Sequence, residues 1–360
     1  MRIAMLAAQD APGWRAAHVE GLSAALSALG HEVAVHHPPA DLPGQQLGQF
    51  VDSLRTEWAR ARPDLVHGHS WRPGLAAVLA AQPSGVPVIQ SFHGLGTGAG
   101  QRTGVERLVG KQAALVVATC EHELLELAAA GVPRSRIALA ARGVDVELFQ
   151  PRGDTAQRTG LRRIVTVADP MVDNGLVDLV AALPRLGEVE LVIAGTPGSG
   201  EADRITRCAR RFGVDERVRL LGVVPRAELP ALLRSADVVA CVPPQATWDA
   251  LALEAMACGV PVVATAVGGL TDAVIDGVTG VLVPPRDLKQ LVRRLRAVLD
   301  DETFRNTCEI AGVDRVQARH TWPDVGRSVE RLYRHVLEPA TPTRKIRAPR
   351  PLTTRDSAMS

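Results

Sequence analysis

The chain has 360 residues, enough for two hydrophobic cores of ordinary domain size. Its apolar content of 46% and charged content of 22% are typical of a globular protein, and its formal net charge is only +2. A near-neutral chain of this kind excludes a basic nucleic-acid-binding domain. The five cysteines form no CxxC pair, which excludes a disulfide or zinc framework and predicts reduced thiols in a cytoplasmic protein.

Membrane-directed segments are not expected. No stretch approaches the roughly 18 consecutive apolar residues of a spanning helix, and the apolar run at 3–8 is too short for a signal-peptide core. Residues 339–360 are rich in Pro, Thr and Arg and carry five basic residues against one acidic residue. We predict a disordered, solvated tail there, and a peripheral contact with anionic lipid is the alternative.

The first half of the chain alternates short apolar runs with amphipathic segments, which is typical of a parallel sheet covered by helices. Strands are predicted at 2–8, 31–36, 65–69, 86–92 and 114–119, and the segment 137–140 completes this half. Helices are predicted between them at 17–29, 47–61, 73–81, 102–111 and 121–130.

The second half repeats this alternation. Strands are predicted at 163–168, 189–195, 218–223, 238–242, 260–265 and 280–283. Helices are predicted at 175–186, 202–212, 226–234, 250–258, 270–275, 288–299, 303–320 and 323–337. Because the strands are continuous apolar runs, both faces of each sheet are expected to be covered. The pattern predicts an α/β protein of two doubly wound domains, with the ligand at the carboxyl ends of the strands.

Several segments resemble glycosyltransferase family 4, and they follow one another in the order typical of that family. They are residues 64–69, 88–95, 118–120, 131–136, 143–149, 217–222, 232–237, 253–272, 319–322 and 332–333. The resemblance implies the GT-B architecture, in which two Rossmann-like domains face a central cleft. It also implies retaining transfer of a hexosyl group from a nucleoside-diphosphate sugar to an acceptor.

The same resemblance divides the chain into parts. It implies a first, acceptor-side domain over residues 1–150 and a second, nucleotide-sugar domain over residues 151–322. A C-terminal helix over 323–338 is expected to cross back to the first domain, ahead of the tail at 339–360.

The resemblance assigns roles to individual residues. His93 matches the histidine near the donor sugar and the reaction centre; its alternative is a strand-end histidine with a local hydrogen bond. The implied nucleotide-sugar positions are Gly13, Glu254, Gly268, Gly269 and Leu270. Glu254 would bind the ribose, and its alternative is an ordinary helix glutamate. The nucleotide sugar is a co-substrate, and the resemblance implies no metal ion or other cofactor.

Four positions depart from the family pattern. Ala246 stands where the family has a second, sugar-binding glutamate, and Trp14 replaces a glycine. Asp169 and Asn174 replace the Arg and Lys that bind the diphosphate. At an effective dielectric near 20, each unit charge about 4 Å from another contributes about 4 kcal/mol, so this reversal weakens a normal donor site. The second hypothesis is therefore a noncatalytic protein of the same fold that binds or regulates a partner glycosyltransferase.

Two histidines share one face of a predicted strand. His67 and His69 are two residues apart, so their side chains lie on the same side of the sheet. A metal site needs a third ligand, and none is evident near them in the sequence. We therefore predict no metal site.

Overall fold

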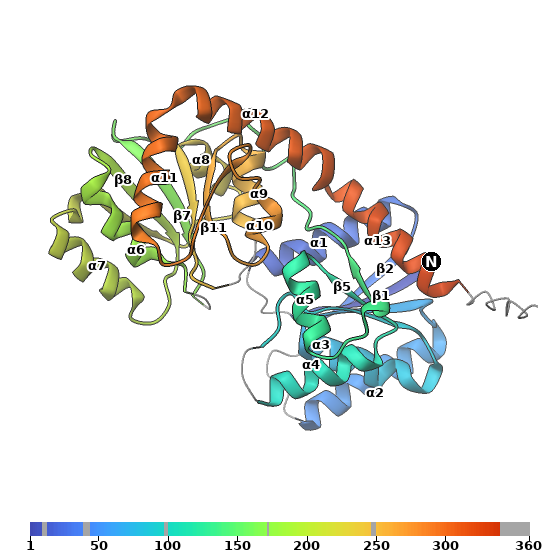
Figure 1. Cartoon of the computed structure of the whole chain (residues 1–360). Coiled ribbons are helices and arrows are strands. Elements are labelled where there is room, and N and C mark those ends of the chain that lie inside the picture. The colour runs from blue at the N-terminus through green and yellow to red at the C-terminus, as the bar shows by residue number, and fades with distance from the viewer. Residues whose placement is uncertain (9–12, 39–43, 97–99, 171–172, 246–249, 339–360) are drawn as a thin grey trace, which may run out of the picture.

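The computed structural model describes residues 1–8, 13–38, 44–96, 100–170, 173–245 and 250–338. The side chains of residues 13–15 and 44–45 also lie outside this description. The helices and strands form two α/β units in series, so the predicted fold class is confirmed (Figure 1). Among the described helices, none combines the length and apolar character needed to cross a bilayer.

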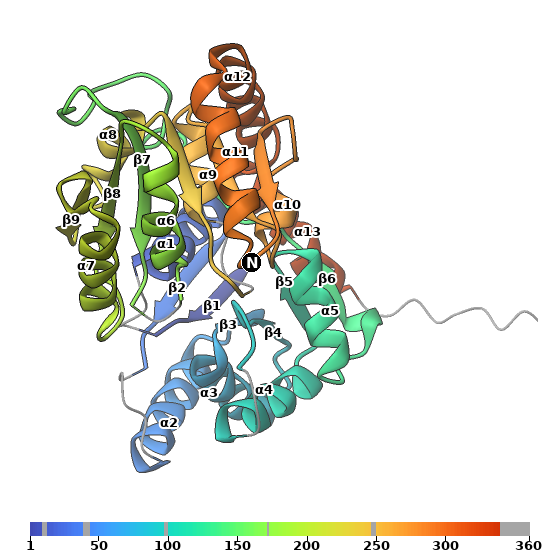
Figure 2. The same ribbon diagram turned by 60° about the vertical axis from the view of Figure 1, so that its left-hand side comes forward.

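The first unit contains a parallel six-stranded sheet in the order β2-β1-β3-β4-β5-β6. Its strands are β1 (Arg2–Leu6), β2 (Glu32–His36), β3 (Leu65–His69), β4 (Val88–Ser91), β5 (Leu115–Ala118) and β6 (Ile137–Leu139). Its helices are α1 (Gly13–Ala28), α2 (Gly44–Arg60), α3 (Trp71–Ala81), α4 (Gln101–Gln112) and α5 (Glu121–Ala129). Helices α2, α3 and α4 lie on the side of this sheet away from the second unit (Figure 2).

The second unit contains a parallel six-stranded sheet in the order β12-β11-β10-β7-β8-β9. Its strands are β7 (Arg162–Ala168), β8 (Val189–Gly195), β9 (Val218–Gly222), β10 (Val238–Cys241), β11 (Val262–Thr265) and β12 (Gly280–Val283). Its helices are α6 (Leu176–Ala182), α7 (Glu201–Phe212), α8 (Leu229–Arg234), α9 (Ala250–Ala257), α10 (Leu270–Ala273), α11 (Leu288–Asp300) and α12 (Glu302–Arg319).

The core of the second unit has two layers, one on each face of the sheet. Residues of α6, α7 and α11 pack on one face, and residues of α8, α9, α10 and α12 pack on the other. Helix α9 ends where Gly259 takes a left-handed conformation, with φ of +72°. The chain can then reverse into the buried strand β11.

The last helix, α13 (Trp322–Leu337), returns to the first unit. Its residues Val325, Val329 and Tyr333 are buried in the same core as α1 and β1. The Tyr333 hydroxyl lies 2.6 Å from Nδ1 of His67 on β3. One helix thus connects the second unit to the core of the first.

Candidate active site

Glu254 lies in the middle of α9 and is 7% exposed. Its Oε1 accepts an ion-paired hydrogen bond of 2.9 Å from Nη1 of Arg226. Burial raises the pKa of Glu254, while the charges of Arg226 and Arg142 lower it. The carboxylate is therefore a desolvated group balanced by nearby cations, which an ordinary surface glutamate is not.

Arg226 lies in a turn before α8. The helix predicted at 226–234 begins three residues later than expected, so that start is wrong. Pro230 stands at the beginning of α8, and the helix starts at Leu229, which leaves Arg226 outside it. Its guanidinium lies 4.9 Å from the centroid of the Phe149 ring, on which it stacks. The side chain is 38% exposed, so its charge remains accessible to a ligand.

Arg142 connects the two units electrostatically. It follows β6 in the segment between the sheets, and it is 3% exposed. Its charge opposes protonation of His18 in the first unit and favours the ionised form of Glu254 in the second. A fixed positive charge therefore lies between residues contributed by both units.

The turn after β11 brings Gly268, Gly269 and Leu270 together, and all three are buried. Gly268 has φ of +53°, a conformation that favours glycine, and Leu270 begins the short helix α10. Oδ2 of Asp272, in the same helix, accepts a 2.6 Å hydrogen bond from the backbone N–H of Glu121 at the start of α5. This turn therefore lies where the second unit contacts the first.

His93 follows β4 in the first unit and is 2% exposed. Its φ of +57° is unusual for a residue other than glycine. Its Nε2 lies 3.0 Å from Nδ1 of His69, and the rings of the two residues are stacked. Strain of this kind persists where the surroundings fix the residue, and it is frequent at functional sites.

The loop at the expected diphosphate position is closed by hydrogen bonds between two of its own residues. The backbone N–H of Asp169 donates to Oδ1 of Asn174 at 3.1 Å, and Nδ2 of Asn174 donates to the carbonyl of Asp169 at 2.9 Å. Asn174 thus closes the loop, and neither residue supplies a cation there. Ala246 lies outside the described residues, as do the side chain of Trp14 and the loop before α1, which begins at Gly13.

Three residues near these positions were not singled out by the sequence: Arg226, Arg142 and His18. Each is near its partner only in the folded chain, since Arg226 and Glu254 lie in different elements. Nothing in local periodicity separates them from the many other arginines and histidines. The sequence shows no third ligand near His67 and His69, whereas in the folded chain His18 and His93 both lie beside His69.

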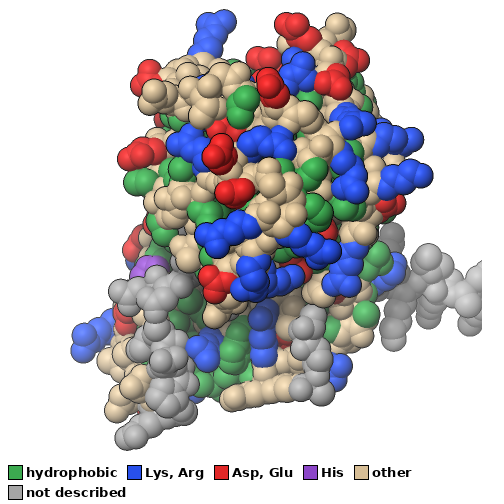
Figure 3. All heavy atoms as spheres, turned by 90° about the vertical axis from the view of Figure 1, so that its left-hand side faces the viewer, with side chains coloured by type: hydrophobic (Ala, Val, Ile, Leu, Met, Phe, Trp, Pro, Cys, Tyr) green, Lys and Arg blue, Asp and Glu red, His purple; other side chains and the backbone are tan. Residues whose placement is uncertain are grey.

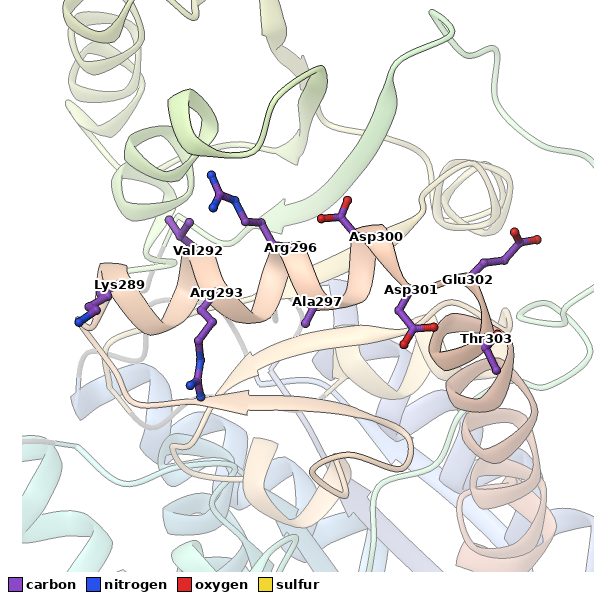
Figure 4. A pocket seen from close by; sticks show the side chains of 9 residues that line it. All are labelled: Lys289, Val292, Arg293, Arg296, Ala297, Asp300, Asp301, Glu302 and Thr303. Carbon is purple, nitrogen blue, oxygen red and sulfur yellow. The ribbon is translucent and has the colours of Figure 1, made fainter.

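A separate hollow lies along the outer surface of α11 and the start of α12 (Figure 4). It is lined by basic residues such as Arg293 and Arg296 and by acidic residues such as Asp300 and Asp301. Lys and Arg side chains also stand among Asp and Glu on the outer face of the second unit (Figure 3). This hollow contains none of the residues considered above, and charges of both signs line it.

Two parallel Rossmann-like units, with a last helix returning to the first, define the GT-B class of glycosyltransferases. The family model described as "Glycosyltransferase Family 4" matches residues 16–148, and the one described as "Glycosyl transferases group 1" matches residues 162–301. A D-inositol 3-phosphate glycosyltransferase of Frankia alni is 32% identical over 83% of this chain and 81% of its own length. The chain belongs to glycosyltransferase family 4.

Further comparisons support the same classification. Glycogen synthase of Mycobacterium tuberculosis is 29% identical over 92% of this chain and 94% of its own length. Sucrose-phosphate synthase from Thermosynechococcus elongatus shares the fold with a TM-score of 0.82, at 24% identity over 93% of this chain and 99% of that one. HepE of Anabaena in complex with UDP-glucose gives a TM-score of 0.78 at 18% identity, over 93% of this chain and 100% of that one.

Proposed function

We propose that this glycosyltransferase moves a hexosyl group from a nucleoside-diphosphate sugar to an acceptor, with retention of configuration. The observation that carries the proposal is the buried carboxylate of Glu254, paired with Arg226 and influenced by Arg142. The family resemblance assigns Glu254 to the ribose of the donor. Support for a nucleotide-sugar donor also comes from HepE, whose structure contains UDP-glucose.

The reaction needs positive charge near the diphosphate, because the departing nucleoside diphosphate gains negative charge as the sugar–oxygen bond breaks. Neither Asp169 nor Asn174 supplies positive charge. The side chain of Asn174 instead forms hydrogen bonds with the backbone of Asp169. Arg226 and Arg142 are two cations close to Glu254. We infer that they replace the missing pair, with Arg226 turning from Glu254 to a phosphate oxygen when the ribose occupies the carboxylate.

The proposal also gives His93 a role, which is to bind the donor sugar. Its contact with His69 and its positive φ fix the direction of the imidazole before a substrate arrives. A fixed ring can hydrogen-bond a hydroxyl of the donor sugar at little entropic cost. As the resemblance implies, the departing phosphate accepts the proton of the acceptor, so transfer itself uses no protein base and no metal ion.

Calorimetry with UDP, GDP, ADP and their glucose conjugates tests the proposal. We expect one of these compounds to bind the wild type at micromolar concentration, and Glu254→Ala to abolish that binding. Arg294→Ala is a matched control, since Arg294 forms an ion pair with Asp276 on the surface, away from Glu254. Micromolar binding that survives Glu254→Ala would contradict the assignment of the ribose site.

A noncatalytic partner of another glycosyltransferase is the second candidate function. The mutual hydrogen bonds of Asp169 and Asn174 favour it, because they occupy the loop that otherwise contacts the diphosphate. In this case no nucleotide binds the wild type. Binding then appears only in the triple variant Asp169→Arg, Asn174→Lys, Ala246→Glu.

A further inference from the structure

Three buried histidines meet at the carboxyl edge of the first sheet. His69 is the last residue of β3, His93 follows the neighbouring strand β4, and His18 lies in α1. Their exposed fractions are 3%, 2% and 7%. One nitrogen atom of each ring lies within 4.8 Å of the others. Segments far apart in the sequence thus form a compact cluster of imidazoles, here called the histidine cluster.

The spacing within the histidine cluster fits a metal ion. Nδ1 of His69 and Nε2 of His93 are 3.0 Å apart, and the ring centroids of His18 and His93 are 4.9 Å apart. Two imidazole nitrogens bound to one tetrahedral Zn²⁺ at about 2.05 Å are about 3.3 Å from each other. A cation shared by the three rings therefore requires the His69–His93 contact to open slightly and the three ligand atoms, now within 4.8 Å of one another, to converge.

Two ring nitrogens of the cluster also need a partner. Nε2 of His69 and Nδ1 of His18 are buried and form no hydrogen bond with the described residues. Neighbouring His67 differs, because its two nitrogens contact the Tyr333 hydroxyl at 2.6 Å and Ser91 Oγ at 3.0 Å. Buried polar atoms are nearly always satisfied, so Nδ1 of His18 points to a ligand, whereas Nε2 of His69 is a different atom from the Nδ1 that faces His93.

The chemistry of the cluster selects the kind of cation. All three rings are almost fully buried, which disfavours a charged imidazolium, and metal ligation requires the neutral ring. The charge of Arg142 near His18 opposes a cation, so the nitrogen ligands must outweigh it. An all-imidazole set suits late first-row metals and excludes Mg²⁺ and Ca²⁺, which require oxygen.

We propose that His18, His69 and His93 bind one late first-row divalent cation such as Zn²⁺, each through a ring nitrogen. Three protein ligands leave a fourth position for water. The cation replaces the hydrogen bond between His69 and His93, and the ring that donated it keeps its proton on the other ring nitrogen, so both imidazoles stay neutral. This proposal replaces the expectation of no metal site. Binding of the cation does not depend on the nucleotide-sugar donor. Because His93 is assigned to the reaction centre, the cation should also inhibit transfer, a consequence that rests on the proposed function.

Titration of the full chain with Co²⁺, followed by visible absorption, tests the site. We expect one equivalent to give the ligand-field bands of nitrogen-bound, four-coordinate Co²⁺, and Zn²⁺ to displace it. His18→Ala should weaken binding at least about 100-fold, since it removes one of three ligands. His122→Ala is the matched control, because exposed His122 pairs only with Glu126 among the described residues.

Three outcomes would overturn the proposal: no bands with the wild type, bands unchanged in His18→Ala, or thiolate charge-transfer bands that indicate cysteine ligands. Burial raises the pKa of Cys258 to about 12 and of Cys308 to about 11, which disfavours the last outcome. If His18→Ala does not fold, the wild type alone decides the question. Bound Co²⁺ should then shift the imidazole proton resonances of three histidines in its NMR spectrum, and a spectrum without such shifts contradicts the site.

Discussion

Glu254 is both buried and close to two arginines, Arg226 and Arg142. Burial raises its pKa, and the charges of Arg226 and Arg142 oppose this effect only in part. Keeping such a carboxylate costs stability at neutral pH, so its presence favours a role in binding. A surface residue with a purely helical role would not have these surroundings.

The raised pKa of Glu254 predicts how stability depends on pH. A carboxyl whose pKa is raised on folding stabilises the folded state at a pH below its pKa in the unfolded chain, here 4.5. This contribution is lost as the pH rises through the pKa of the folded state. Glu254→Gln should therefore unfold at a higher temperature than the wild type at about pH 8 and at the same temperature at about pH 4. Thermal unfolding across this range checks the prediction, and a variant less stable than the wild type at pH 8 contradicts it.

At the scale of elements, α13 and α1 form the contact that joins the C-terminal helix to the first unit. The indole of Trp322 lies against Gly21 of α1 and Gly143 of the connecting segment, and a Cβ at either glycine would overlap it. His18 contacts the same indole, with ring centroids 5.4 Å apart. Close packing at Gly21 therefore positions α13 and one wall of the histidine cluster together.

Gly21→Ala should destabilise the protein although alanine favours helices. Overpacking against Trp322 costs about 1–3 kcal/mol, more than the roughly 1 kcal/mol gained in helix propensity. Gly48→Ala in α2 is the matched control, because among the described residues nothing beyond its chain neighbours and its own helix backbone lies within 4 Å of the new Cβ, and a gain in stability is expected. Urea denaturation measures both variants. Equal effects in Gly21→Ala and Gly48→Ala would show that the Trp322 contact imposes no constraint.

Elements were easier to predict than contacts. Strand β11 follows from a continuous apolar run: it is predicted at 260–265 and lies at Val262–Thr265, after Gly259 in its left-handed conformation. The pairing of Arg226 with Glu254 and the approach of His18 to His93 do not follow, because they depend on how distant elements pack. Local periodicity encodes which face of an element is buried. It does not encode which polar side chains meet across the fold.

At the scale of the whole molecule, the two units contact each other through Asp272 as well as through α13. Its carboxylate accepts from the backbone N–H of Glu121, at the N-terminus of α5, where the helix dipole favours a negative charge. The second unit thus supplies a capping group to a helix of the first. This contact lies beside the Gly268–Leu270 turn and fixes the approach of that turn to the first unit.

Asp272→Ala should loosen the arrangement of the units without unfolding either one. The lost charged hydrogen bond contributes about 0.5–2 kcal/mol, so the domains should sample more open arrangements. Small-angle X-ray scattering should show a larger radius of gyration than the wild type, with an unchanged circular dichroism spectrum. Asp300→Ala, which removes the exposed pair with Arg162, should leave the radius unchanged. An unaltered radius in Asp272→Ala would mean that this hydrogen bond does not hold the units together.

Arg226 and Glu254 together form the proposed donor site for a nucleotide sugar. The most direct measurement is the calorimetric affinity of UDP-glucose for the wild type, Arg226→Ala and Arg294→Ala. Loss of a charge-assisted hydrogen bond of about 1.5–3 kcal/mol predicts roughly 10- to 100-fold weaker binding in Arg226→Ala and no change in Arg294→Ala. Wild-type and Arg226→Ala proteins that bind UDP-glucose with equal affinity would show that Arg226 does not bind the donor.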